Sequence, residues 1–350
     1  MPWSIEGIRD PMAMAGDGIN FRLFVYSFFR KRKFSSTPPH LDSSTPTMRQ
    51  FVFLILFIPS ALCGQDMPFL QVLGTAQDAG YPHAGCRKVC CLPAWQDSVP
   101  REPVSCLGLV DPTGGRSWLF DATPDLPAQM MALQEWTGKN TVDGIFLTHA
   151  HIGHYTGLMY LGREAMGAQQ VPVYAMPRME EFLTGNGPWG QLVALENITL
   201  QSIKAGMVVD LSASLRVTPI QVPHRDEYSE TVGYLIQGPE KSALFIPDID
   251  KWSEWDQSLI PWVLQTDWVF IDATFFDGTE LPGRDMSEIP HPFVVETMAL
   301  LEGLPDEQKA RVFFIHMNHT NPMLDPGSDA TRQVLEAGFQ IARTGMRFGM

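Results

Sequence analysis

The sequence predicts an α/β protein, a mixed sandwich of sheets with helices outside, on three observations. With 350 residues, of which 45% are hydrophobic and 18% charged, the chain can bury a full core. From Phe69 onward, short apolar stretches typical of strands alternate with segments that have helical spacing. Over 215–247 several strand-like stretches follow one another without a helix between them, which argues against a purely parallel, doubly wound sheet.

The predicted strands are short apolar stretches bounded by polar or turn-forming residues. They cover 69–74, 105–111, 117–122, 144–149, 171–176, 215–222, 231–236, 242–247, 268–273 and 311–316. The predicted helices cover 123–136, 155–166, 293–301 and 329–337. Ser287 and Asp329 are predicted as early caps, because short polar side chains accept hydrogen bonds from the free amides at a helix start.

The charge balance limits the class of partner. Acidic residues outnumber basic ones, 39 to 25, which gives a formal net charge of −14. The longest basic cluster is the short run at 30–33. Binding to a phosphate backbone is therefore not expected to be the main task, and we expect a small-molecule substrate and no nucleic-acid partner. The sequence leaves the oligomeric state open.

The first 64 residues differ in composition from the rest. Residues 34–47 are rich in Ser, Thr and Pro and cannot bury a core. Met48 and a basic residue are then followed by an apolar run at 51–58 and by small residues that end near Gly64. A basic start, an apolar run and a small-residue end are typical of a secretory signal peptide.

We therefore expect three parts in the chain. Residues 1–47 would be a disordered extension upstream of the true start codon, 48–64 a signal peptide, and 65–350 the folded domain. The mature protein would be exported, periplasmic or extracellular, with no stable membrane insertion after cleavage. The alternative is a cytoplasmic tail ahead of a membrane anchor, but the apolar run is shorter than the roughly 18 residues that an anchor needs.

Three histidines lie within six residues, directly after a predicted strand and before a predicted helix. They are His149, His151 and His154, and the whole chain holds only nine histidines. Neutral imidazole is a strong ligand for zinc and iron, and sites in α/β proteins tend to lie at the carboxyl ends of strands. We predict a metal site here. The alternative is an ordinary surface turn.

Further candidate ligands follow other predicted strands. His224, Asp248 and His316 each come after an apolar strand and open a polar loop. A single buried histidine is more often a hydrogen-bonded core residue than a ligand, but together these residues supply the imidazole and carboxylate groups that a metal site requires. His291, in a proline-flanked loop, is a candidate proton donor to a leaving group, or else a loop-packing residue.

The segment THAHIGHYTGL at 148–158 resembles the H-x-H-x-D-H signature of the metallo-β-lactamase superfamily, and the later candidate ligands follow in that family's order. The resemblance runs from Phe69 to the C-terminus. It implies a four-layer αβ/βα sandwich of two mixed sheets with helices outside. It also implies a first metal held by His149, His151 and His224, a bridging Asp248, and a second metal at His154 and His316.

One departure from the family's signature affects the second metal. The family's aspartate, a ligand of that metal, is replaced by Gly153. Glycine offers no ligand, so a second metal would have to bind through His154, His316 and the bridging Asp248. We expect it to be weak, absent or of a different kind.

Longer segments resemble the coenzyme PQQ synthesis protein B branch of the superfamily. They are LGTAQDAGYPHAGCRKVCC (73–91), HRDEYSETVGYLI (224–236), FIPDIDKW (245–252), ELPGRDMSEIPHPFV (280–294) and HMNHTNP (316–322). The resemblance implies a role connected with pyrroloquinoline quinone. Members of that branch have been described as carriers of the cofactor or its precursor, and as metal-dependent oxygenases that act on the tyrosine of the precursor peptide. Many members have altered histidine motifs, whereas this chain keeps three imidazoles.

The cysteines form a second candidate site. Of five cysteines, Cys63 would leave with the signal peptide, and Cys86, Cys90 and Cys91 cluster in one loop. In an exported protein these could form disulfides, with Cys90 or Cys91 reaching Cys86 or Cys106. The alternative is a structural zinc. The family context favours zinc, because a related branch of cyclic phosphodiesterases carries a Cys-rich loop here, closed by a histidine for which His319 is the candidate.

The primary site predicts a hydrolytic mechanism. A metal held by three imidazoles leaves a position for water and lowers the pKa of that water from 15.7 to about 7. Asp248 would orient the water and act as base, and His291 as acid. We therefore predict a metal-dependent hydrolase with one or two Zn²⁺ ions, Fe or Mn being alternatives, and a structural Zn²⁺. The alternatives are an oxygenase of the PQQ pathway, since iron at the same open position suits dioxygen, and a non-catalytic carrier for pyrroloquinoline quinone or its precursor.

Overall fold

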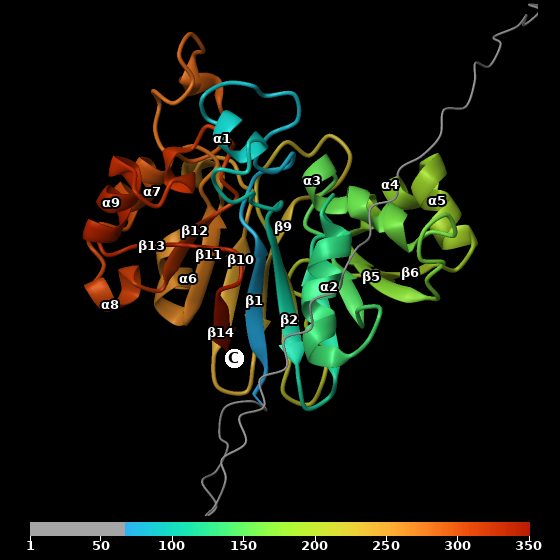
Figure 1. Cartoon of the computed structure of the whole chain (residues 1–350). Coiled ribbons are helices and arrows are strands. Elements are labelled where there is room, and N and C mark those ends of the chain that lie inside the picture. The colour runs from blue at the N-terminus through green and yellow to red at the C-terminus, as the bar shows by residue number, and fades with distance from the viewer. Residues whose placement is uncertain (1–66) are drawn as a thin grey trace, which may run out of the picture. The chain divides into compact units, whose positions relative to one another are not determined.

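Two mixed β-sheets pack face to face in the computed structural model of the chain, which describes residues 67–350 (Figure 1). The extension and signal peptide expected over 1–64 lie outside the described residues, so they stay predictions. Among the residues that are described, no helix has the length and apolar composition needed to cross a membrane.

The first sheet is built from the first half of the domain and closed by the C-terminal strand. Strand β1 pairs antiparallel with β14 and β2, whereas β3, β4, β5 and β6 run parallel to one another. In spatial order the strands are β14 (Arg347–Gly349), β1 (Phe69–Gly74), β2 (Cys106–Asp111), β3 (Arg116–Phe120), β4 (Gly144–Phe146), β5 (Val171–Ala175) and β6 (Ile198–Ser202).

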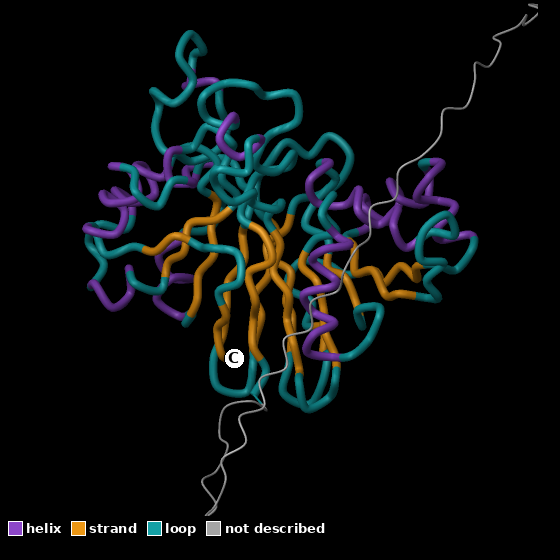
Figure 2. Tube along the Cα trace, in the orientation of Figure 1, coloured by secondary structure: helices purple, strands orange, loops and turns teal. Residues whose placement is uncertain are grey.

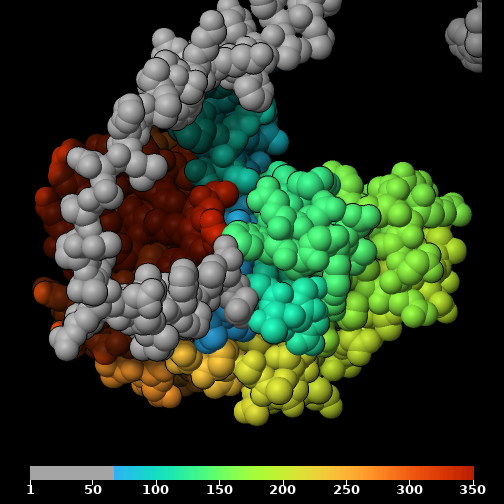
Figure 3. Space-filling view, turned by 60° about the horizontal axis from the view of Figure 1, so that its bottom comes forward, coloured from blue at the N-terminus to red at the C-terminus, as the bar shows by residue number. Residues whose placement is uncertain are grey.

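The second sheet is built from the second half of the domain. Strands β10 to β13 run parallel to one another, and β7, β8 and β9 form an antiparallel edge. In spatial order the strands are β13 (Gln340–Ile341), β12 (Val312–Ile315), β11 (Trp268–Asp272), β10 (Ser242–Ile246), β9 (Val232–Gln237), β8 (Arg216–Gln221) and β7 (Val209–Asp210). In Figure 3 the teal-to-green half and the orange-to-red half of the domain gather on separate sides.

Helices cover the outer face of each sheet. Helix α2 (Leu126–Thr137) packs its apolar face on the first sheet, which α4 (Pro177–Gly185) and α5 (Gly187–Ala194) also flank. On the second sheet lie α6 (Leu259–Gln265), α7 (Val294–Leu300) and α9 (Asp329–Glu336). The remaining short elements are α1 (Leu92–Trp95), α3 (Ile152–Tyr155), α8 (Asp306–Lys309) and the 3-10 turns η1 (Thr156–Leu161), η2 (Trp252–Glu254), η3 (Met286–Glu288) and η4 (Pro322–Leu324). The predicted four-layer sandwich is therefore confirmed.

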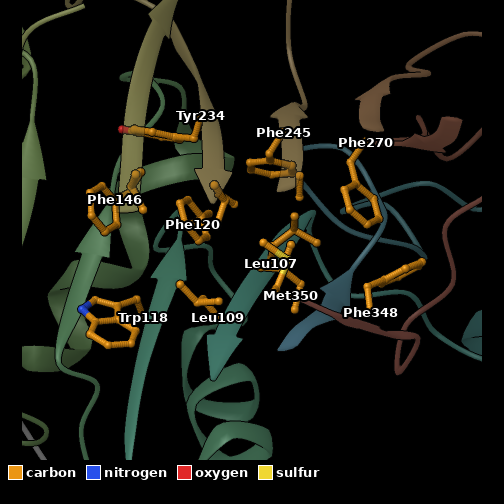
Figure 4. Packing of buried hydrophobic residues seen from close by; sticks show 14 of the residues in the cluster. Leu107, Leu109, Trp118, Phe120, Phe146, Tyr234, Phe245, Phe270, Phe348 and Met350 are labelled. Carbon is orange, nitrogen blue, oxygen red and sulfur yellow. The ribbon is translucent and has the colours of Figure 1, made fainter. Parts of the chain in front are cut away.

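The largest apolar side chains fill the space between the two sheets. Phe120 and Phe146 of the first sheet meet Tyr234 and Phe245 of the second, with ring centroids between 5.5 and 6.2 Å apart (Figure 4). All four side chains are fully buried. Burial of a large apolar side chain stabilises a fold by about 1.5–3 kcal/mol, so this aromatic layer fixes how the sheets face each other.

All ten predicted strands form, with ends shifted by up to three residues, and three of the four predicted helices form close to their expected bounds. The helix predicted over 155–166 is instead the short α3 followed by η1. At Gly157 the chain packs directly on neighbouring backbone, since a β-carbon there would lie 2.0 Å from the carbonyl oxygen of Thr123. The predicted caps were also wrong. Asp285, not Ser287, caps η3, and Ser328, not Asp329, caps α9 by accepting from Thr331 N.

Loops from both sheets gather at one end of the strands, the upper end in Figure 2. Strands β3 and β4 of the first sheet and β10, β11 and β12 of the second point their carboxyl ends toward these loops. Polar side chains that follow these strands in the sequence are thereby brought together.

Candidate metal centre

Four of the predicted ligands converge at this end of the sheets. His149 and His151 follow β4, His224 follows β8 and Asp248 follows β10, and one ligand atom from each lies within 4.8 Å of the others. His149 Nε2 lies 2.8 Å from His151 Nδ1 and 3.2 Å from Asp248 Oδ2. His224 Nε2 lies 3.3 Å from both His151 Nδ1 and Asp248 Oδ1. A tetrahedral zinc with bonds of 2.0–2.1 Å holds its ligands about 3.3 Å apart, so this set fits such an ion.

Hydrogen bonds between the sheets fix the position of the histidine turn. The amide of Val232 donates to the carbonyl of Thr148 over 3.1 Å, and the amide of Ala150 donates to Ser229 Oγ over 2.9 Å. The buried hydroxyl of Tyr234 also donates to the carbonyl of Leu147. The end of β4 is thus held against the start of β9 on both sides of His149.

A second group of potential ligands adjoins the first. His154 Nε2 and His316 Nε2 lie 3.8 and 3.9 Å from Asp248 Oδ2, so that one carboxylate faces both groups. The side chain of Asp78, in the loop after β1, lies beside them with Oδ1 at 3.3 Å from His154 Nε2. Asp78, His154 and His316 each offer an atom within 4.8 Å of the others.

On each sheet, one aspartate and one threonine form hydrogen bonds that orient the histidines. On the first sheet, Asp121 accepts from His154 Nδ1 over 2.7 Å and from the hydroxyl of Thr148, which lies 3.0 Å from His149 Nδ1. On the second sheet, Asp272 accepts from the hydroxyl of Thr274, which lies 3.0 Å from His316 Nδ1. Such outer carboxylates fix the ring orientation and tautomer of metal-binding histidines.

Two of these residues have a strained backbone. Asp121 has φ = 76° and His316 has φ = 67°, in the left-handed region that only glycine adopts at no cost. Strain of this kind costs on the order of 1–3 kcal/mol and clusters at functional sites. Here it turns both side chains toward the centre at the ends of β3 and β12.

Charges in the centre compensate one another. Burial alone would raise the pKa of Asp248, but His224, His291 and His316 outweigh it and hold that pKa well below its usual value. Although burial lowers the pKa of His224, Asp248 and Asp250 raise it to about 10. Burial and the neighbouring His154 lower the pKa of His149. A carboxylate with so low a pKa is ionised at neutral pH and a weak proton acceptor, which favours the ligand role of Asp248 over that of a base.

His291 also lies at the centre. Its Nδ1 is 2.8 Å from Asp272 Oδ2 and 3.2 Å from Asp248 Oδ1. Burial lowers the pKa of this imidazole, but Asp272 and Asp248 raise it above its usual value. A protonated His291 is therefore favoured, as a proton donor requires.

A cavity of about 300 Å³ opens beside His291. Its lining includes two guanidinium groups, Arg225 and Arg284, and apolar side chains such as Phe275 and Leu281. Positive charge beside an apolar wall suits a small anionic ligand with an apolar part.

The cysteine cluster forms a separate site. Sγ atoms of Cys86, Cys90 and Cys91 and a ring nitrogen of His319 lie within 4.8 Å of one another. The Sγ atoms of Cys86 and Cys90 are 3.7 Å apart, close to the ~3.8 Å that a tetrahedral zinc with Zn–S bonds of about 2.3 Å requires. All four described cysteines are free, and Cys106 lies apart, with its thiol facing the carbonyls of Leu107 and Asp121. The disulfide alternative is therefore not formed in this structure.

Protonation favours a metal at the cysteine cluster. Burial, with the nearby charges of His83 and Lys88, lowers the pKa of His319 to about 4, so its imidazole is neutral at pH 7. Its Nδ1 lies 3.0 Å from Asn318 Oδ1, which leaves Nε2 free as a ligand. Burial raises the pKa of Cys91 to about 12. Three adjacent thiols ionise together only when a cation offsets their charge.

Glu280, near the cysteine cluster and the cavity, gives a pH-dependent prediction. Its carboxylate accepts from the amide of Phe276 and the hydroxyl of Thr320, and burial raises its pKa from 4.5 to about 7. Because the pKa is raised in the folded protein, the stabilising contribution is complete below pH 4.5 and is lost as the pH rises through 7. We expect Glu280→Gln to remove this loss, so that its free energy of unfolding relative to the wild type rises by up to about 3 kcal/mol between pH 5 and 8.

Urea unfolding at both pH values tests this prediction, with the exposed Glu288→Gln in the same loop as the control. An equal pH dependence of the wild type and Glu280→Gln would contradict it.

The structure thus brings together all of the residues that the sequence predicted for the main site: His149, His151, His154, His224, Asp248, His291 and His316. It likewise brings together Cys86, Cys90, Cys91 and His319. Sequence reasoning missed Asp78, Asp121, Asp250 and Asp272. Asp121 and Asp272 had a signal, since each ends a predicted strand (WLFDA and VFIDA) as Asp248 does, whereas Asp78 lies in a loop with no such pattern. The ligand and proton-transfer roles themselves stay predictions.

Comparisons with known proteins agree with this architecture. A family model described as "Beta-lactamase superfamily domain" matches residues 116–317, more than half of the chain. Coenzyme PQQ synthesis protein B of Klebsiella pneumoniae is 26% identical over 311 residues, which cover 79% of this chain and 97% of that protein. The protein of the same name from Methylorubrum extorquens is 27% identical over 304 residues, with 79% and 97% covered.

Two solved structures share the fold. The crystal structure of Zn²⁺-bound PqqB from Methylobacterium extorquens has a TM-score of 0.68 at 22% identity and covers 81% of this chain and all of that one. A diphosphatase from the PhnP family has a TM-score of 0.56 at 23% identity, with 81% and 97% covered.

Proposed function

Because the chain belongs to the beta-lactamase superfamily, we propose that it is a metal-dependent hydrolase whose metal is held by His149, His151, His224 and Asp248. The observation that carries this proposal is the convergence of three imidazole nitrogens and one carboxylate oxygen within 4.8 Å, at distances that fit a tetrahedral ion. With the three imidazoles and Asp248 as ligands, such an ion would bind water by expanding to five-coordinate, and it would lower the pKa of that water to about 7 and so supply hydroxide at neutral pH.

Side chains around the centre are assigned to charge neutralisation, proton donation and substrate binding. Asp248, ionised and buried, is a ligand and neutralises the imidazoles that face it. His291 donates a proton to the leaving group, because Asp272 holds its Nδ1 and keeps the ring protonated. Arg225 and Arg284 bind the anionic part of the substrate in the adjoining cavity.

Metal-dependent turnover tests this function. We expect the zinc-loaded protein to hydrolyse an anionic phosphodiester such as bis(p-nitrophenyl) phosphate in preference to the neutral p-nitrophenyl acetate. Stripping the metal with a chelator should abolish turnover, and reloading should restore it. His151→Ala should lower kcat/KM by more than about 100-fold, since loss of a ligand exceeds the effect of losing its outer partner. Turnover that persists without metal, or none at all on a panel of phosphodiesters and esters, would contradict the proposal.

The similarity to coenzyme PQQ synthesis protein B favours a second candidate, a role with pyrroloquinoline quinone as carrier or oxygenase. That quinone carries carboxylates on an apolar ring system. The carboxylates would pair with Arg225 and Arg284 of the cavity, and the ring would pack on its apolar side chains. Calorimetry with pyrroloquinoline quinone separates the two. Saturable heat from a protein that hydrolyses nothing would favour the carrier, whereas turnover without such heat would favour the hydrolase.

A further inference from the structure

The space beside Gly153 is filled by another residue. A β-carbon at position 153 would lie 2.4 Å from Asp78 Oδ1 and 2.5 Å from Asp78 Cα, far inside van der Waals contact. No side chain fits at 153 while Asp78 keeps this position. The carboxylate of Asp78 therefore reaches the region that an aspartate at 153 would otherwise serve.

Three buried polar atoms face one another at this point without a hydrogen bond. They are Asp78 Oδ1, His154 Nε2 and His316 Nε2. Asp78 Oδ1 and His154 Nε2 are 3.3 Å apart, but their geometry is not that of a hydrogen bond. A buried polar atom left unpaired costs about 1–3 kcal/mol, so three such atoms together indicate a common partner.

The outer hydrogen bonds indicate which partner fits these atoms. His154 Nδ1 donates to Asp121, so the neutral ring carries its lone pair on Nε2. The hydroxyl of Thr274 donates to Asp272 and so accepts from His316 Nδ1, which leaves a lone pair on His316 Nε2 as well. Two lone pairs and a carboxylate oxygen that face one point match a cation, and two imidazoles with carboxylates are ligands that zinc accepts.

The loop of Asp78 is held in place by the loop of His316. The amide of Gln77 donates to the carbonyl of Met317, and the amide of Met317 donates to the carbonyl of Thr75, both over 2.8 Å. Asp78 directly follows Gln77, and His316 directly precedes Met317. These backbone hydrogen bonds therefore set the distance between the Asp78 and His316 side chains.

We propose that Asp78 replaces the carboxylate that position 153 lacks, so that Asp78, His154, His316 and the shared Asp248 bind a second divalent cation. This inference rests on the proposed function only in that Asp248 is common to both metals. It revises the expectation from Gly153 alone that a second metal would be weak or absent.

Zinc stoichiometry of the purified full chain tests this inference. We expect two zinc ions at the centre and a third at the cysteine cluster. Asp78→Asn should lose one ion of the three and leave the affinity of the first site unchanged within about threefold. The exposed Asp97→Asn, nearby in the chain, is the control and should keep all three ions.

The outcomes separate this inference from the proposed function. If Asp78→Asn keeps every ion that the wild type binds, or if the wild type binds one ion at the centre because Asp78 only pairs with a protonated His154, the inference falls while the first site stands. If the wild type binds two ions at the centre but hydrolyses nothing, the inference stands and the proposed function falls.

Discussion

Asp248→Asn is expected to remove metal from the centre and to lower metal-dependent turnover by more than about 100-fold. The carboxylate of Asp248 faces imidazoles of both groups, with Oδ1 at 3.3 Å from His224 Nε2 in the first and Oδ2 at 3.8 Å from His154 Nε2 in the second. An asparagine keeps the size of the side chain but carries no charge, so the carboxylate that the two groups of histidines share is lost. Metal content and turnover of the zinc-treated variant measure the effect.

The same change should destabilise the metal-free protein. Asp248 is 3% exposed and compensates the charge of the imidazoles around it. Removing one partner of a buried ion pair costs about 3–5 kcal/mol, although here the histidines can lose their protons and reduce that cost. We expect the free energy of unfolding of the apoprotein to fall by about 3 kcal/mol in urea unfolding at neutral pH.

Asp111→Asn is the matched control. Asp111 is also a buried aspartate in an ion pair, with Arg116 at 2.9 Å, but it ends β2 beside the start of β3, at the end of the strand opposite the centre. It should lower stability without any change in the metal content. A variant Asp248→Asn with full metal content would show that the carboxylate is not a ligand.

The fold could be predicted from the sequence largely because its strands are buried on both faces. Stretches such as 268–271 and 312–315 are continuously apolar, and such short runs indicate buried strands even without alternation. The edge strands β6, β7, β13 and β14 were missed. They are short or partly exposed, and their pairing is decided by neighbours that are distant in sequence.

In the candidate site, too, residues with a local sequence pattern could be predicted, and residues positioned by distant parts of the chain could not. His149, His151 and His154 occur close together in the sequence, and Asp248 follows a clear strand, so they could be found. Asp78 could not, because its role depends on the absence of a side chain 75 residues later at Gly153. Only the packing of the loop after β1 against the turn after β4 shows that one residue takes the place of the other.

Cys90→Ser is expected to cost one zinc ion and to lower the melting temperature. Cys90 lies in the loop between β1 and β2, and the cluster joins this loop to His319 in the loop after β12. A structural zinc contributes about 10–16 kcal/mol in small zinc-binding peptides, and loss of one of four ligands should remove at least about 3 kcal/mol of that. For a domain of this size, about 3 kcal/mol corresponds to a fall in melting temperature of roughly 6–12 °C.

Zinc content and thermal unfolding, with and without a chelator, measure this effect. Cys106→Ala is the control, because Cys106 is also a free thiol but lies outside the cluster, and it should keep the zinc of the wild type. A chelator should lower the melting temperature of the wild type toward that of Cys90→Ser and leave Cys90→Ser itself little changed at this site. A wild type in which thiol titration finds Cys86 and Cys90 oxidised would instead show that a disulfide, and not a metal, holds the two loops. In a metal-bound cluster the three thiolates stay titratable once the protein is denatured with chelator, because zinc protects sulfur without oxidising it.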